Sequence, residues 1–109
     1  MIGRVRGRSS FERIARTGSR ARAGVLWCTF VLDPLASPPH VAYAIGRAVG
    51  PAVTRNRLRR RLRALLQQKQ LHLPAGLYLI GAAPAAAGRS FAELERDLDR
   101  LLARISTST

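Results

Sequence analysis

The sequence predicts an α+β fold in which three helices accompany one small mixed sheet. Strand-forming residues gather in three short apolar runs, at residues 25–32, 41–45 and 77–82. Apolar residues recur at helical spacing in a short segment near residue 11 and in two longer segments, 51–70 and 91–105. A chain of 109 residues can bury one modest core but not two, so we expect a single domain over residues 1–109.

The N-terminal part is basic. Residues 1–8 carry three arginines among small residues, which predicts an extended basic arm. Ser9 or Ser10 can cap a short helix that runs to about Arg16 and ends at Thr17-Gly18. The apolar side of this helix comprises Phe11, Ile14 and Ala15. On this pattern alone, the simplest interpretation of Phe11 is an ordinary core residue.

Two strands are expected after this helix. Residues 18–24 form a basic connector, and the sequence leaves open whether residues 20–24 add a separate strand. Residues 25–32 are dense in strand formers and predict a buried strand. A loop with three prolines, at residues 33–40, leads to a second strand at 41–45, and we expect the two strands to pair as antiparallel neighbours.

The segment from Pro51 to about Gln70 predicts a helix with two unlike faces. Pro51 suits the first helical position, where its missing N–H costs nothing. Six arginines fall within residues 55–63. At 100° per residue, one side is apolar, formed by Leu58, Leu62, Leu65 and Leu66. The other positions divide into the opposite side (Asn56, Arg60 and Arg63), the flanks (Arg55, Arg59 and Arg61) and Arg57 between them. Val53 falls on the arginine side, so either the first turn winds differently or Val53 enters the core.

The arginine surface indicates nucleic-acid binding. Guanidinium groups stay charged and present a planar fork of donors that matches phosphate oxygens, while an asparagine can also bond base edges or sugar hydroxyls. A merely solvated charged face usually mixes the two signs, yet residues 34–92 contain no acidic residue. Net charge is +13, and residues 1–69 carry all of this excess. We therefore expect salt-dependent binding to a polyanion.

The C-terminal segments look structural. Residues 77–82 predict another buried strand, and residues 91–105 show clear helical periodicity. Ser90 and Glu93 have the spacing of a capping box at the start of that helix. Its acidic residues lie early and its arginines late, as the helix dipole favours.

Several classes of function are disfavoured. Cys28 is the only cysteine, which excludes an intramolecular disulfide or a cysteine-based zinc site, and we expect no metal site in the protein. No apolar run is long enough to span a membrane and no signal-peptide pattern is present, so a cytoplasmic protein without membrane association is expected. His40 and His72 have no neighbouring carboxylates, and no phosphate-cradling glycine loop exists, so we predict no catalytic residue in this chain.

Residues 49–63, from Val49-Gly50-Pro51-Ala52-Val53 through Arg55-Asn56-Arg57 to Leu62-Arg63, resemble the signature of the bacterial ribonuclease P protein family. The rest of the chain, from Phe11 to Ile105, agrees with the family in pattern and spacing. The resemblance implies a fold like the second domain of ribosomal protein S5, with an unusual left-handed βαβ crossover around the central helix. General rules for such crossovers would have predicted a right-handed one.

The resemblance also implies a function. In this family an RNA subunit cuts the 5′ leader from precursor tRNA with Mg²⁺ that it mainly holds itself, and one protein accompanies one RNA. Transferred by position, the residues implied to bind the catalytic RNA are Arg55, Asn56, Arg57, Arg59, Arg60, Arg61 and Arg63. The residues implied to contact the leader are Phe11, Phe30 and Arg47. A second first-helix aromatic of many members is Ala15 here, which reduces the stacking surface.

Two other classes share part of this pattern. A ribosomal or general RNA-binding structural protein would have similar size, charge and lack of an active site, although such proteins often carry long basic extensions. A DNA-binding regulator could place residues 51–70 in a major groove. No helix precedes this one at helix-turn-helix spacing, and no dimerisation element is evident, so the DNA-binding alternative is the weaker of the two.

Overall fold

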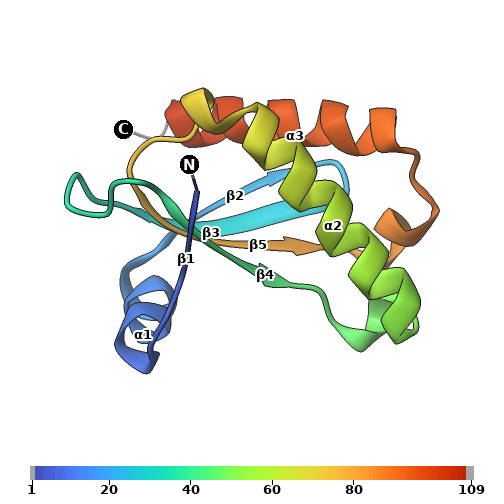
Figure 1. Cartoon of the computed structure of the whole chain (residues 1–109), viewed down its shortest axis with the longest axis horizontal. Helices are drawn as coiled ribbons and strands as arrows, with labels where there is room; N and C mark the ends of the chain where they lie inside the picture. Colours follow the sequence, from blue (N-terminus) through green and yellow to red (C-terminus); the bar gives the residue numbers. More distant parts are fainter. Residues whose placement is uncertain (1, 108–109) are drawn as a thin grey trace.

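The computed structural model describes residues 2–107, which form three α-helices and a five-stranded sheet (Figure 1). The helices are α1 (Arg8–Thr17), α2 (Ala52–Gln68) and α3 (Phe91–Ser106). The strands are β1 (Gly3–Arg4), β2 (Ser19–Ala23), β3 (Leu26–Leu32), β4 (His40–Ala44) and β5 (Gly76–Ala82). Three short 3₁₀ segments connect them, η1 (Arg47–Val49), η2 (Gln70–His72) and η3 (Pro84–Gly88). The α+β prediction is confirmed.

The sheet is mixed and has the strand order β1-β4-β5-β3-β2. Strand β5 is parallel to β4 and antiparallel to β3, so the expectation that β3 and β4 pair directly is wrong. Burial explains why β5 lies between them. Tyr78 and Ile80 are fully buried on one face of β5, and Leu77 is buried on the other, so this strand needs cover on both faces.

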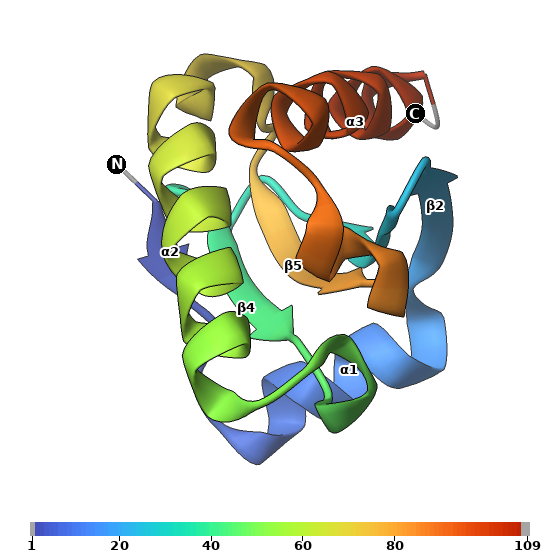
Figure 2. The same ribbon diagram turned by 90° about the vertical axis from the view of Figure 1, so that its right-hand side faces the viewer.

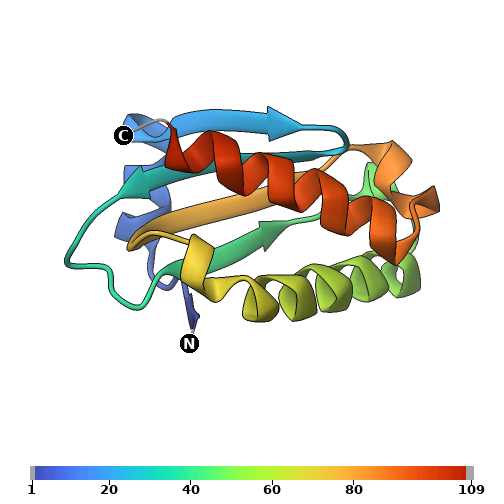
Figure 3. The same ribbon diagram turned by 90° about the horizontal axis from the view of Figure 1, so that it is seen from above.

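The connection from β4 through α2 to β5 is a left-handed crossover. Figure 3 views the sheet from the side covered by α2 and α3, with β4 and β5 both pointing to the right. In this view β5 lies above β4, whereas a right-handed crossover would place it below. The unusual handedness implied by the family resemblance is therefore present in this chain.

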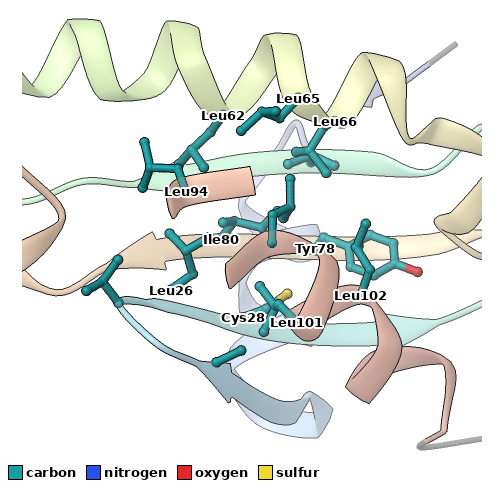
Figure 4. Packing of buried hydrophobic residues seen from close by; sticks show 14 of the residues in the cluster. Leu26, Cys28, Leu62, Leu65, Leu66, Tyr78, Ile80, Leu94, Leu101 and Leu102 are labelled. Atoms are coloured by element: carbon teal, nitrogen blue, oxygen red, sulfur yellow. The ribbon is translucent and has the colours of Figure 1, made fainter. Parts of the chain in front are cut away.

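Helices α2 and α3 cover one face of the sheet, and α1 lies on the other (Figure 2). Leucines of α2 and α3 meet the inward residues of β3 and β5 in one large core (Figure 4). Fully buried members include Leu62, Leu65, Leu94 and Leu101. Under α1 a smaller cluster forms around Ile14, together with Leu77 on the opposite face of β5. The apolar stripe of α2 predicted from helical periodicity is confirmed.

The N-terminal part is more ordered than the sequence indicated. The arm predicted over residues 1–8 is not simply extended in its described part, residues 2–8, because β1 pairs in parallel with the start of β4 and Val5 is buried. Helix α1 begins at Arg8 after Gly7, whose φ is 83°, so neither predicted serine is the N-cap. The basic connector contains strand β2, which pairs with β3 and answers the question left open by the sequence.

The N-terminal ends of α2 and α3 lie close to where the sequence predicts them. Pro51 is the N-cap of α2 rather than its first residue, and the helix is regular from Ala52. Val53 stays on the arginine side, 72% exposed. In α3 the capping box is confirmed, because the Glu93 N–H donates to Ser90 Oγ at 3.1 Å and the Ser90 N–H donates to Glu93 Oε1 at 2.8 Å.

One ion-pair cluster joins the end of α2 to α3. Lys69 Nζ lies 2.7 Å from Asp99 Oδ1 and 3.1 Å from Glu95 Oε2. The hydrogen bond to Asp99, and after it the one to Glu95, raises the pKa of Lys69. Two of the four acids on α3 therefore pair with the lysine at the C-terminal end of α2. Within the described residues, no ion pair joins an acid of α3 to the arginines nearer the start of α2.

Candidate nucleic-acid interface

The outward face of α2 carries the exposed part of the arginine-rich segment. Burial of the leucines on the opposite side fixes which residues point away from the core. Those exposed to solvent are Asn56, Arg57, Arg60 and Arg63. Within residues 2–107, Arg57 and Arg60 form no hydrogen bond or ion pair through their side chains. Their guanidinium groups are available to phosphate oxygens of a partner.

The flanking arginines bind the protein's own backbone. Arg55 Nε donates to the Gly50 carbonyl oxygen at 3.1 Å, and Arg59 Nη2 donates to the Ile45 carbonyl oxygen at 3.4 Å. These two carbonyls lie on either side of η1, so both arginines brace that turn against α2. Arg61 Nη1 donates to the Arg89 carbonyl oxygen at 3.4 Å, which links α2 to the segment before α3. The arginine-rich segment thus combines a bracing set with an exposed set.

An open cleft of about 630 Å³ lies between the N-terminal strand, α1, β4 and α2. Its aromatic side chains are Phe11, which is 42% exposed, and Tyr43. The Arg63 guanidinium carbon lies 5.8 Å from the centre of the Tyr43 ring, a cation–π contact. The remaining lining residues are Ile2, Gly3, Arg4, Val5, Arg6, Val41, Ala42, Arg59 and Gln67. Among the described residues, the cleft therefore joins two aromatic rings to four arginines, and none of those that line it is acidic.

The predicted leader contact at Phe30 is wrong. Phe30 is 2% exposed and belongs to the core beneath α2 and α3, where its ring stacks on Tyr78 with the centroids 6.1 Å apart. Alternation along β3 is the reason. Leu26, Cys28 and Phe30 point into the core, while Trp27 points to the opposite face of the sheet. A ring enclosed in this way offers no surface to RNA.

Arg47 and Phe11 lie at different ends of the molecule. Arg47 is exposed in η1, beside the start of α2, and does not line the cleft at Phe11. Figures 1 and 3 both show α1 at one end of the sheet and η1 at the other. Of the three residues predicted to contact the leader, Phe11 and Arg47 are therefore not brought together. Phe11 is also too exposed to be the ordinary core residue that the apolar pattern favoured.

Sequence reasoning missed two aromatic residues beside these surfaces. Tyr43 lies in a predicted strand, and the structure places it in the lining of the cleft, where its ring contacts Arg63. Trp27 lies in the run, residues 25–32, that the sequence predicts as a buried strand. Its indole lies over Gly81, where an added Cβ would clash with the ring, and Arg22 lies directly opposite Trp27 on β2. The alternation of β3 was the signal that could have separated Trp27 from the core.

Side chains that could ligate a metal ion lie apart from one another within residues 2–107. His, Cys, Asp and Glu nowhere gather there into a group of three or more that could hold a metal ion. Burial raises the pKa of the Cys28 thiol to about 12, which leaves it protonated and unreactive. Asp33 accepts a hydrogen bond from Arg13 at 2.7 Å, and this bond holds the pKa of the carboxyl below its ordinary value. Within the same residues, no helix has the length and apolar character needed to cross a bilayer.

Comparison with known proteins assigns the family. The ribonuclease P family model matches residues 3–106. A ribonuclease P protein component from Nocardioides sp. is 42% identical over 105 residues, covering 94% of this chain and 90% of the relative. A second, from Acidothermus cellulolyticus, is 38% identical and covers 94% of this chain and 88% of the relative.

Solved structures show the same fold at lower identity. The Staphylococcus aureus RNase P protein superposes with a TM-score of 0.84 at 18% identity, covering 94% of each chain. The Thermotoga maritima RNase P protein gives 0.81 at 21% identity, covering 93% of this chain and 96% of that one. These likenesses establish the fold, while the family model and the curated relatives establish the descent. The chain therefore belongs to the ribonuclease P protein family.

Proposed function

We propose that the exposed face of α2 binds the catalytic RNA of ribonuclease P and that the cleft at Phe11 takes the 5′ leader of precursor tRNA. Family membership makes the chain the protein component of this tRNA-processing endoribonuclease and implies an RNA partner. The catalytic role of that RNA, the contacts with the leader, the 1:1 stoichiometry and a cytoplasmic location are parts of the proposal.

The observation that carries the proposal is the exposed guanidinium face on a rigidly held helix. Four leucines anchor α2 in the core, and Arg55 and Arg59 tie its first turns to the backbone around η1. Arg57 and Arg60 then project from a fixed frame. A fixed array of guanidinium groups can match a particular arrangement of phosphates, which a disordered basic tail cannot do without losing more conformational entropy.

The cleft suits a single-stranded segment. Its arginines can track a sugar–phosphate backbone, while the exposed ring of Phe11 is available to bases and Tyr43 lines the same cleft. Stacking of a base on an aromatic side chain is worth about 1–3 kcal/mol and tolerates any base. A leader whose sequence varies between precursors requires this kind of recognition.

The proposed division of labour leaves bond cleavage to the RNA. Mg²⁺ prefers oxygen ligands, above all carboxylates, and the cleft lining contains none. The charged side chains that line the cleft are arginines, which repel a cation. The described lining of this cleft therefore does not fit a Mg²⁺ site, and we assign the ions mainly to the RNA subunit. The protein's part is to bind, orient and neutralise charge.

Reconstitution at low Mg²⁺ tests this proposal. A bacterial ribonuclease P RNA would be assayed on labelled precursor tRNA with the wild-type chain, without protein, and with the Arg57→Gln/Arg60→Gln variant. We expect the wild type to restore cleavage at the mature 5′ end and the variant to lose most of that rescue. If the wild type gives no rescue and binds the RNA no better than random RNA, the general RNA-binding alternative holds instead.

A further inference from the structure

One arginine of the bracing set also holds an exposed polar side chain. Arg59 is half-buried, and its Nη1 donates to Asn56 Oδ1 at 2.9 Å while its Nη2 reaches the Ile45 carbonyl oxygen. Asn56 itself is exposed on the outward face of α2, between Arg57 and the turn at η1. A single guanidinium therefore connects the end of β4 to the amide of Asn56.

This contact fixes which way the amide faces. A guanidinium has only donors, so the atom of Asn56 that approaches it must be the carbonyl oxygen. The amide nitrogen, with both of its N–H donors, then points away from Arg59. We propose that Arg59 is a positioning residue that presents the Asn56 NH₂ group as a directed donor to an acceptor oxygen or nitrogen of the catalytic RNA. The proposal rests on the function proposed above.

The arrangement adds something that arginine charge does not supply. Arg57 and Arg60 can contact phosphates, which every RNA carries, so their contribution depends on salt and gives no information about base or sugar groups. A neutral donor held in one orientation strengthens binding only of an RNA that places an acceptor within hydrogen-bond distance of it. Because Arg59 is anchored to Ile45, the amide is fixed relative to the sheet before the RNA arrives, which reduces the entropy lost on binding.

Substitution at Asn56 separates this role from a structural one. Asn56→Asp keeps an oxygen that can accept from Arg59, and strengthens that bond, but replaces both outward donors with an acceptor. If Asn56 serves only to hold Arg59, this variant should bind RNA as well as a matched charge control. Ala52→Asp is that control, because it adds one negative charge one helical turn earlier, at another exposed position of α2.

The measurements are affinity for the catalytic RNA and for random RNA between 0.1 and 0.5 M salt, with thermal unfolding for each variant. We expect Asn56→Asp to bind the catalytic RNA at least tenfold more weakly than Ala52→Asp does. The melting temperature of Asn56→Asp should be no lower than that of the wild type. Asn56→Ala should lose about five- to tenfold, the size expected for one hydrogen bond, with an unchanged salt slope. Equal binding by Asn56→Asp and Ala52→Asp would overturn the proposal.

A double-mutant cycle tests whether Arg59 acts through Asn56. Arg59→Lys keeps the charge but loses the fork that reaches both partners. We expect Arg59→Lys and Asn56→Ala each to weaken binding, and the double variant to bind no more weakly than the weaker of the two single variants. Fully additive losses would show that Arg59 does not act through Asn56. If the wild-type chain shows no preference for the catalytic RNA, the proposed function fails; if that preference exists and only the cycle is additive, this inference alone fails.

Discussion

Replacing Arg57 and Arg60 with glutamine should weaken RNA binding strongly and leave the fold intact. Both side chains are exposed, and neither bonds to another residue within the described part of the chain. Glutamine keeps a long polar side chain with good helix propensity, so α2 should persist. The change therefore removes two cations from the interface and little else.

The magnitude follows from counterion release. Each phosphate contact contributes about 0.7–0.9 to the slope of log affinity against log salt concentration, so two contacts contribute about 1.4–1.8. Measured from a 1 M reference, this slope corresponds to a loss of about 25- to 60-fold at 0.1 M salt. Fluorescence anisotropy with labelled catalytic RNA, titrated at several salt concentrations, gives both the slope and the affinity.

A variant with the same loss of charge at the bracing positions is the control. In Arg55→Gln/Arg61→Gln the lost donors face the Gly50 and Arg89 carbonyls, so we expect a lower melting temperature and a smaller change in the salt slope. The reasoning is refuted if Arg57→Gln/Arg60→Gln leaves the salt slope at the wild-type value. An equal change of slope in the two double variants would refute the division of the arginines into two sets.

Four further predictions concern single side chains. Phe11→Ala should weaken binding of a single-stranded leader by about 1–3 kcal/mol with little change in stability, as measured by leader titration. Phe30→Ala should lower the unfolding free energy by about 3–5 kcal/mol, as measured by urea unfolding. An unfolding free energy of Phe30→Ala equal to that of the wild type would contradict the burial of this ring. Ser90→Ala should lower the unfolding free energy by about 1 kcal/mol, because the capping box is lost, and an unchanged urea midpoint would show that the cap contributes nothing. The Arg13 guanidinium lowers the pKa of Asp33, so this carboxylate stabilises the fold at neutral pH, and the stabilisation is lost as the pH falls through the lowered pKa. Urea unfolding of Asp33→Asn between about pH 2 and pH 6 should therefore show a flatter acid limb than the wild type, and parallel curves would contradict this.

The helices were predictable because their signals are local. The leucine spacing of α2 and the Ser90 and Glu93 pair of α3 lie within a few residues of each other, and the structure confirms both. Strand order is not local. Leu26–Leu32 and His40–Ala44 are neighbours in sequence, and only the need of β5 for cover on both faces separates them. Neither segment contains a sequence feature that indicates that β5 lies between them.

The site was predictable as a surface but not residue by residue. Helical projection already separates Arg60 from Arg55 and Arg59. It could not show that Arg55 and Arg59 donate hydrogen bonds to backbone carbonyl oxygens. The position of Phe30 depended on which face of β3 meets the helices, and a shift of one residue along a strand reverses that assignment. Long-range packing therefore decides which aromatic residues remain exposed.

Site-directed cross-linking in the reconstituted complex tests the central claim most directly. Cys28 is buried and its pKa is raised to about 12, so a cysteine introduced at an exposed position can be labelled selectively. Photo-cross-linkers would be attached at Gln67→Cys in the cleft, at Ala52→Cys near Asn56, and at Ala103→Cys on α3. We predict cross-links from residue 67 to leader nucleotides, from residue 52 to the catalytic RNA, and none from residue 103. Cross-linking to RNA mainly from residue 103 would contradict the proposed interface.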